Sequence, residues 1–175
     1  KRIVFATFNM LAQGSMWHDG SLYVAATPII WKLTDEDGDG VAERREKWIE
    51  TKEMTACLND LRGPYLGPDG WIYWSKGPAQ QTYQVGGEPW STKARHILRR
   101  HPDGQEVEQV MVGGMDNVVE VAFSRGGERF VTNTNIQMLG QPRRDGILHA
   151  VYGGVYPKDI LPVYDFPWSG PRMMP

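Results

Sequence analysis

The sequence contains a single cysteine, Cys57, among 175 residues. An intrachain disulfide, a CxxC redox pair and a thiolate zinc site each need more than one thiol, so all three are excluded. The four histidines show neither HxH nor HxxxH spacing, and they predict no zinc or iron centre.

An excess of one charge and a long apolar run are also missing. The 19 basic and 21 acidic residues give a formal net charge of -2, which provides no electrostatic reason to expect nucleic acid as a partner. No apolar run approaches the roughly 20 residues that span a bilayer, so no membrane-spanning segment is predicted. The fingerprints of P-loops, dinucleotide-binding folds and serine-hydrolase elbows do not occur either.

The sequence does have an abundance of turn-forming residues and an internal repeat. Its 20 glycines and 12 prolines suit a turn-dense all-β chain. The repeat is a glycine followed by a short alternating strand, at intervals of 50 and 57 residues: GSLYVAA from Gly20, GWIYWSK from Gly70 and GERFVTN from Gly127. Each glycine closes a tight turn of the kind that joins the two strands of a hairpin.

Four short strands per copy of roughly 50 residues is the period of a β-propeller blade. The sequence therefore predicts an all-β chain of about three blades, each with four antiparallel strands, over residues 8–58, 59–115 and 116–165. Closed propellers usually have more blades than three, so we expect a partial propeller domain cut at both ends. A β-sandwich with irregular strand spacing is the alternative.

The strand GWIYWSK is aromatic on both faces. Alternation sends Ile72 and Trp74 to one side and Trp71 and Tyr73 to the other. A strand with apolar side chains on both sides is predicted to be buried between two sheets, as a core element rather than a platform for sugars.

The segment DEDGDGVAERRE, residues 35–46, follows the apolar, strand-like run IIWKL. It has acidic residues at the first, third and fifth of twelve positions and a glycine at the sixth, which is the pattern of a calcium loop. The predicted ligands are Asp35, Asp37, Asp39, the carbonyl of Val41, Glu43 and Glu46. No amphipathic helix precedes the loop, so we expect a structural calcium staple between strands rather than a sensor EF-hand. A solvated acidic turn is the alternative, because Asp-Gly pairs form turns without a metal.

Five strings resemble, together and in order, a bacterial family of membrane-bound dehydrogenases: LYVAATPIIWKLTDEDGDGVAERRE, LGPDGWIYWSKG, ARHILRRHPDG, GGMDNVVEVAFSRGGERF and RRDGILHAVYGGVY. The propeller of that family is similar to that of the soluble quinoprotein glucose and sorbosone dehydrogenases. The resemblance implies a periplasmic or otherwise extracytoplasmic location, calcium, pyrroloquinoline quinone on the propeller axis, and a small-molecule sugar or alcohol as substrate. It also implies the remaining blades and a CxxCH cytochrome c module as partners within the full-length protein.

The general base that the resemblance implies is missing. In the pattern HxGGxLxFGPDG a histidine lies eleven residues before the last glycine, and alignment on Gly70 puts Asn59 at that position. An asparagine amide cannot take a proton from a hydroxyl, and Arg62, three residues later, is permanently charged. Enzyme activity is therefore open, and a non-catalytic propeller scaffold that binds glycans or a protein partner is the alternative. A calcium-dependent lactonase-type propeller would need carboxylates and an asparagine around one axial cation.

Polar residues that begin two inner strands form the candidate axial site. Alignment of the copies on Gly70 and Gly127 places Asn59–Asp60 opposite Asp116–Asn117. Glu120 falls inside the apolar run VVEVAF, where a carboxylate needs a partner, and Arg62 on the neighbouring blade could supply it. The catalytic candidates are Asn59, Asp60, Arg62, Asp116, Asn117 and Glu120. Capping of turns is the alternative role for the Asn and Asp residues.

Two adjacent arginines, Arg143 and Arg144, precede the strand-like run GILHA. They are the candidate cofactor-binding residues, because neighbouring guanidinium groups can hold a carboxylate or a phosphate. A solvated turn is the alternative. His149, within the same run, is predicted to form a structural hydrogen bond.

Overall fold

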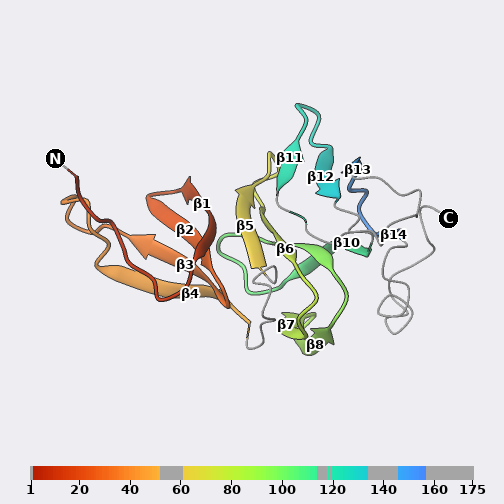
Figure 1. Ribbon diagram of the computed structural model, residues 1–175, viewed down its shortest axis with the longest axis horizontal. Helices are drawn as coiled ribbons and strands as arrows, with labels where there is room; N and C mark the ends of the chain where they lie inside the picture. Colours follow the sequence, from red (N-terminus) through yellow and green to blue (C-terminus); the bar gives the residue numbers. More distant parts are fainter. Residues whose placement is uncertain (1, 52–60, 114–117, 119, 134–145, 157–175) are drawn as a thin grey trace, which may run out of the picture.

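The structure, a computed structural model, describes residues 2–51, 61–113, 118, 120–133 and 146–156 (Figure 1). Every regular element in these ranges is a β-strand and none is a helix, so the all-β prediction is confirmed. No helix within the same ranges is long and apolar enough to cross a membrane. The strands form a four-stranded sheet, a five-stranded sheet, a three-stranded sheet and a separate hairpin.

The first sheet is a four-stranded antiparallel meander within residues 8–58. Its strands, in spatial and chain order, are β1 (Ala12–His18), β2 (Ser21–Ala26), β3 (Ile29–Thr34) and β4 (Arg44–Glu50). The turn between β1 and β2 has positive φ angles at Asp19 (44°) and Gly20 (70°), which is the backbone twist that a two-residue hairpin favours. The repeat glycine therefore has the role that the sequence predicted for it.

The second sheet has the strand order β14-β10-β9-β6-β5, in which β5, β6, β9 and β10 form another antiparallel meander. Its strands are β5 (Leu61–Leu66), β6 (Ile72–Lys76), β9 (His96–Arg100), β10 (Glu108–Gly113) and β14 (Gly154–Tyr156). A hairpin of β7 (Gln81–Val85) and β8 (Glu88–Thr92) is inserted between β6 and β9 and forms its own two-stranded sheet. This hairpin turns at Gly86 and Gly87, whose φ angles are 60° and 81°.

The third sheet differs from its prediction. It comprises β11 (Val121–Phe123), β12 (Arg129–Asn133) and β13 (Gly146–His149). The run expected to complete it with a fourth antiparallel strand is β14, which instead pairs in parallel with β10 of the second sheet. The edge of β10 has backbone groups that need partners, and β14 supplies them while burying Val155 and Tyr156. The prediction of four strands in the third copy is therefore wrong for the described residues.

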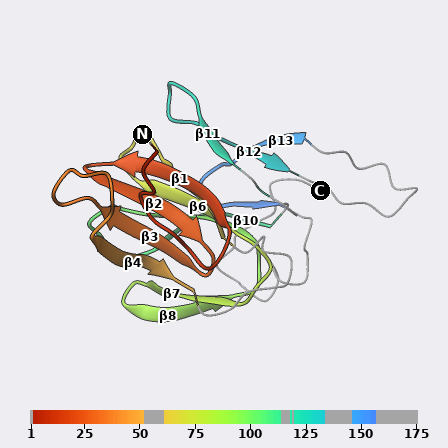
Figure 2. The ribbon, with the colours of Figure 1, turned by 60° about the vertical axis from the view of Figure 1, so that its left-hand side comes forward.

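The first two sheets pack face to face (Figure 2). Trp48 of the first sheet forms edge-to-face ring pairs with its neighbour Tyr23 and with Trp74 of β6, with centroids 5.5 and 5.7 Å apart. Ile72 and Trp74 lie in this core, whereas Tyr73 and Trp71 lie in the cluster that faces the third sheet. The predicted division of the β6 side chains between two faces is thus confirmed.

The other face of the first sheet is covered by the N-terminal segment, residues 2–8. Phe5, Ala6 and Phe8 pack against a cluster that contains Val24 and Leu33. The segment is also tied to the β3–β4 loop, because the Ala42 amide donates to the Phe5 carbonyl at 2.9 Å.

The order and stacking of the sheets are those of consecutive blades. The described strands do not form a closed ring, so closure into a propeller stays a prediction.

Candidate metal site and neighbouring cleft

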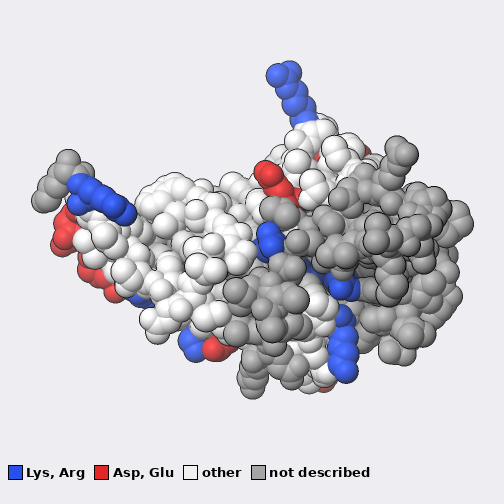
Figure 3. Space-filling model, in the orientation of Figure 1, with Lys and Arg blue, Asp and Glu red and all other residues white. Residues whose placement is uncertain are grey.

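The acidic loop connects β3 to β4 at the end of the molecule where the N-terminus lies (Figure 1). In the space-filling view, acidic atoms gather at this end (Figure 3). β3 ends at Thr34, and Gly38 and Gly40 take positive φ angles of 81° and 89° in the loop. These two glycines allow the tight curl that turns alternate carboxylates inward.

Backbone amides of the loop hold the carboxylates in place. Asp35 accepts from the Gly38 amide at 2.6 Å and from the Gly40 amide at 2.9 Å. The Asp39 carboxylate accepts from Val41 at 2.8 Å. Each ionised carboxylate has about four lone-pair directions, so these contacts fix its orientation and still leave it able to bind a cation.

Four of the predicted ligands lie together. One carboxylate oxygen from each of Asp35, Asp37, Asp39 and Glu43 lies within 4.8 Å of the corresponding oxygens of the other three. Two oxygens on opposite sides of a calcium ion are about 5 Å apart, because each Ca–O distance is about 2.4 Å. The donor set is therefore of the right kind and the right size for Ca²⁺.

No basic side chain among the described residues forms an ion pair with these four carboxylates. The nearby Arg44 pairs with two other acids, Glu36 and Glu46, at 3.5 Å each. Four like charges at this distance repel one another, and a divalent cation would relieve that repulsion.

One predicted ligand, Glu46, is placed differently. Glu46 lies in β4, opposite Lys32, and is not a member of the four-carboxylate group. Its place results from the early start of β4 at Arg44, since no helix turns the twelfth position back toward the loop. Val41 donates its amide to Asp39.

The predicted axial site is described in part. Asn59, Asp60, Asp116 and Asn117 lie outside the described residues. Arg62 is on β5, and Glu120 directly precedes β11. Both act on Tyr65, whose hydroxyl has a pKa raised to about 12. Burial is the main cause, the Glu120 carboxylate adds to the increase, and the Arg62 guanidinium opposes it. Arg62 and Glu120 thus share one polar neighbourhood.

The expected placement of Glu120 within a buried inner strand is wrong. Its side chain is exposed and the strand begins only at Val121. Water can therefore solvate the carboxylate, and the desolvation argument for an obligatory arginine partner no longer applies.

The predicted cofactor residues Arg143 and Arg144 also lie outside the described residues. His149 is exposed, pairs with the Glu128 carboxylate and stacks on Phe130 with ring centroids 5.3 Å apart. This is the structural hydrogen bond that was predicted for it.

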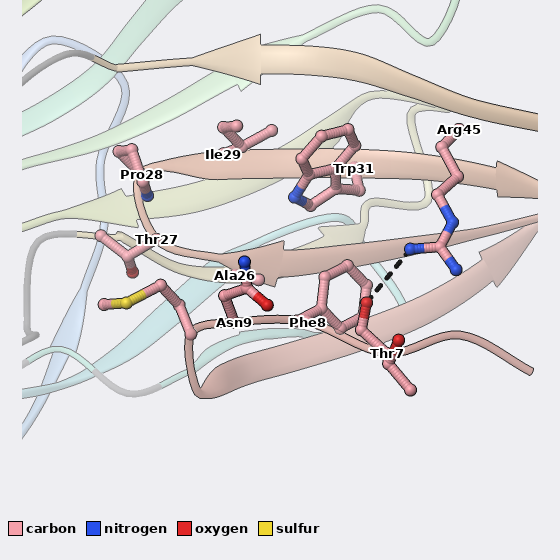
Figure 4. A pocket seen from close by; sticks show the side chains of 10 residues that line it. Thr7, Phe8, Asn9, Ala26, Thr27, Pro28, Ile29, Trp31 and Arg45 are labelled. Carbon is pink, nitrogen blue, oxygen red and sulfur yellow. Dashed lines mark hydrogen bonds between the residues drawn. The ribbon is translucent and has the colours of Figure 1, made fainter. Parts of the chain in front are cut away.

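A cleft of about 370 Å³ lies between the N-terminal segment and the first sheet (Figure 4). One wall consists of residues 7–10, and the other of residues 26–29 with Trp31 and Arg45. Sequence reasoning missed it, because the two walls come from segments that are brought together only by tertiary packing. No local spacing pattern marks Arg45 or Asn9 as neighbours.

The protein is thus of the all-β class, with an acidic loop between two strands whose four carboxylates could hold a metal ion. The comparison with protein families matches residues 1–153 to the family described as Domain of unknown function (DUF7133), and the chain belongs to that family. No curated protein and no solved structure matched the chain.

Proposed function

We propose that residues 35–43 bind one structural calcium ion. The observation that carries this proposal is the group of four carboxylates within 4.8 Å of one another, without a basic partner in the described ranges. Asp35, Asp37, Asp39 and Glu43 would hold the ion. Its role would be to fix the β3–β4 connection and, through the Ala42–Phe5 hydrogen bond, the N-terminal segment that packs on it.

The wider function that we propose is an extracytoplasmic propeller segment of a quinone-dependent sugar or alcohol dehydrogenase. Its support is the sequence resemblance, together with the mutual electrostatic influence of Arg62 and Tyr65 on β5 and Glu120 just before β11. Addition of pyrroloquinoline quinone followed by a dye-linked dehydrogenase assay on a panel of sugars tests this proposal. Absence of quinone binding would reject it.

The second candidate is a non-catalytic scaffold that binds glycans or a protein partner. Asn59 at the position of the expected histidine base favours it. Quinone binding with turnover of any sugar would argue against the scaffold, and glycan binding without turnover would support it.

The first prediction concerns calcium and stability. Calcium at about 100 times its Kd should add about 2.7 kcal/mol to the free energy of unfolding, because it binds the folded loop selectively. Thermal melts in calcium and in EDTA measure this difference. Asp37→Asn should remove most of the calcium-dependent rise in Tm, since it takes one charge from the group.

The matched control is Glu36→Gln, which changes the neighbouring carboxylate outside the group. It should keep the calcium-dependent rise. An equal Tm in calcium and in EDTA for the unmodified chain would contradict the calcium proposal.

A further inference from the structure

The cleft beside the N-terminal segment is rich in hydrogen-bond donors and poor in negative charge. Its one charged lining residue is Arg45, and no acidic side chain lines it in the described part of the chain. The exposed Arg45 guanidinium donates through Nη1 to the Thr7 carbonyl at 3.1 Å. Its Nε and Nη2 groups make no hydrogen bond or ion pair with any described residue, so they can bind a ligand anion.

An aromatic wall lies beside this cation. The rings of Trp31 and Phe8 are 6.5 Å apart and tilted by 43°, and both side chains are only partly buried. The Trp31 indole N–H makes no hydrogen bond within the described ranges, and Figure 4 shows its nitrogen at the ring edge away from Arg45. The wall therefore offers an apolar face and a donor directed along the cleft.

The far end of the cleft is polar again. Figure 4 places Asn9 and Thr27 at the end opposite to Arg45. The Asn9 side chain is exposed, whereas Thr27 is 1% exposed and its hydroxyl has no hydrogen-bond partner among the described residues. An unpaired buried hydroxyl costs free energy, which a polar group entering this end would recover.

We propose that this cleft binds a cyclic, hydroxylated carboxylate of the hexuronate class. Arg45 would pair with the carboxylate through its remaining N–H groups, the geometry in which guanidinium binds carboxylate most strongly. The C–H face of the sugar ring would lie on Trp31, and its hydroxyls would reach the Trp31 N–H and the Asn9 amide. The volume of about 370 Å³ is within the range of small-molecule sites. The proposal rests on neither the calcium nor the quinone proposal.

Titration calorimetry with glucuronate, glucose and benzoate, at fixed calcium, tests the site. Glucuronate should bind more tightly than either of the other two, because glucose lacks the charge and benzoate lacks the hydroxyls. Arg45→Gln should weaken glucuronate binding at least tenfold. Asn9→Ala should weaken it severalfold while leaving benzoate unchanged.

Arg44→Gln is the matched control, because Arg44 is the adjacent exposed arginine and does not line the cleft. It should bind glucuronate like the unmodified chain, and thermal melts should show that all variants are folded. Unchanged glucuronate affinity in Arg45→Gln, or equal affinity for glucose, would overturn the assignment of Arg45. Equal affinity for benzoate would overturn the assignment to sugar acids.

Discussion

His96 is fully buried on β9, where the Thr92 hydroxyl and its Nε2 atom are 3.0 Å apart. Burial holds the pKa of this imidazole well below its ordinary value of 6.5, and the nearby positive charge of Lys76 lowers it further. Lys76 is itself buried and donates to three backbone carbonyls, those of Gly77, Ala79 and Ala94. An imidazolium at this position would therefore meet a fixed cation without water to screen it.

The second prediction concerns pH. Below pH 6.5 the unfolded chain takes up a proton at His96 and the folded chain does not. The contribution of neutral His96 to the free energy of unfolding is therefore complete above pH 6.5 and is lost as the pH falls. For one proton, the free energy of unfolding should fall by up to about 1.4 kcal/mol per pH unit. Urea unfolding between pH 7.5 and 5 measures it. His96→Gln should flatten the slope, and the exposed His101 should serve as a control through His101→Gln.

The strands β1 and β5 approach each other at two glycines. A Cβ atom added to Gly14 of β1 would overlap the backbone carbonyl of Gly63 in β5. The φ angles of the two glycines, 149° and 115°, are also values that other residues rarely adopt. This contact sets how closely the first two sheets meet at their first strands.

The third prediction is that Gly14→Ala destabilises the chain by about 2–3 kcal/mol, because backbone must move to relieve the overlap. Chemical unfolding measures the change. Gly146→Ala is the control, since nothing lies within 4 Å of its added Cβ and its backbone is not in the positive-φ region. A change of less than about 0.5 kcal/mol in Gly14→Ala would show that the two strands separate freely.

The elements that the sequence predicted well are those defined by local patterns. The alternation of side chains along the strand predicted the two faces of β6, and the Asp19–Gly20 pair predicted the first hairpin turn. The β7–β8 hairpin was missed, although its Gly86–Gly87 pair between alternating runs is a recognised hairpin signal. The partner of β14 could not be read from the chain, because its pairing with β10 joins residues about 40 positions apart.

The candidate sites, too, could be predicted where they depend on local spacing and not where they depend on tertiary packing. The spacing of Asp35, Asp37 and Asp39 was sufficient to predict that they converge, since a curled loop brings alternate side chains together. The position of Glu46 depended on the element after the loop, and strand β4 carries this residue away from the other carboxylates. The cleft at Arg45 depends on the path of the N-terminal segment across the sheet, which no periodicity specifies.

At the scale of the whole molecule, one row of aromatic rings joins the first two sheets. It runs from Tyr23 to Trp48 in the first sheet, then to Trp74 in the second sheet and to Tyr83 in the β7–β8 hairpin. The Trp48 indole also donates to the Pro102 carbonyl at 3.0 Å, so this single side chain contacts both sheets and a loop. The two sheets should therefore unfold as one cooperative unit.

The fourth prediction tests that cooperativity. Trp48→Ala should cost about 3–5 kcal/mol, as large-to-small changes in a core do, and hydrogen exchange should accelerate in β6 and β9 as well as in β2 and β3. Trp17→Ala is the control, because Trp17 is 59% exposed on β1. Faster exchange confined to β1–β4 in the Trp48 variant would show that the sheets unfold independently.

The charged strand β4 has a further consequence for the behaviour of the molecule at high concentration. It is an edge of the first sheet, and its residues from Arg44 to Lys47 are all exposed and charged. An open edge is a template on which a second chain can add a strand, and charged side chains oppose that addition. The other large sheet has its β10 edge covered by β14. Replacing the four charges of β4 with threonines would consequently turn this edge into a site of aggregation.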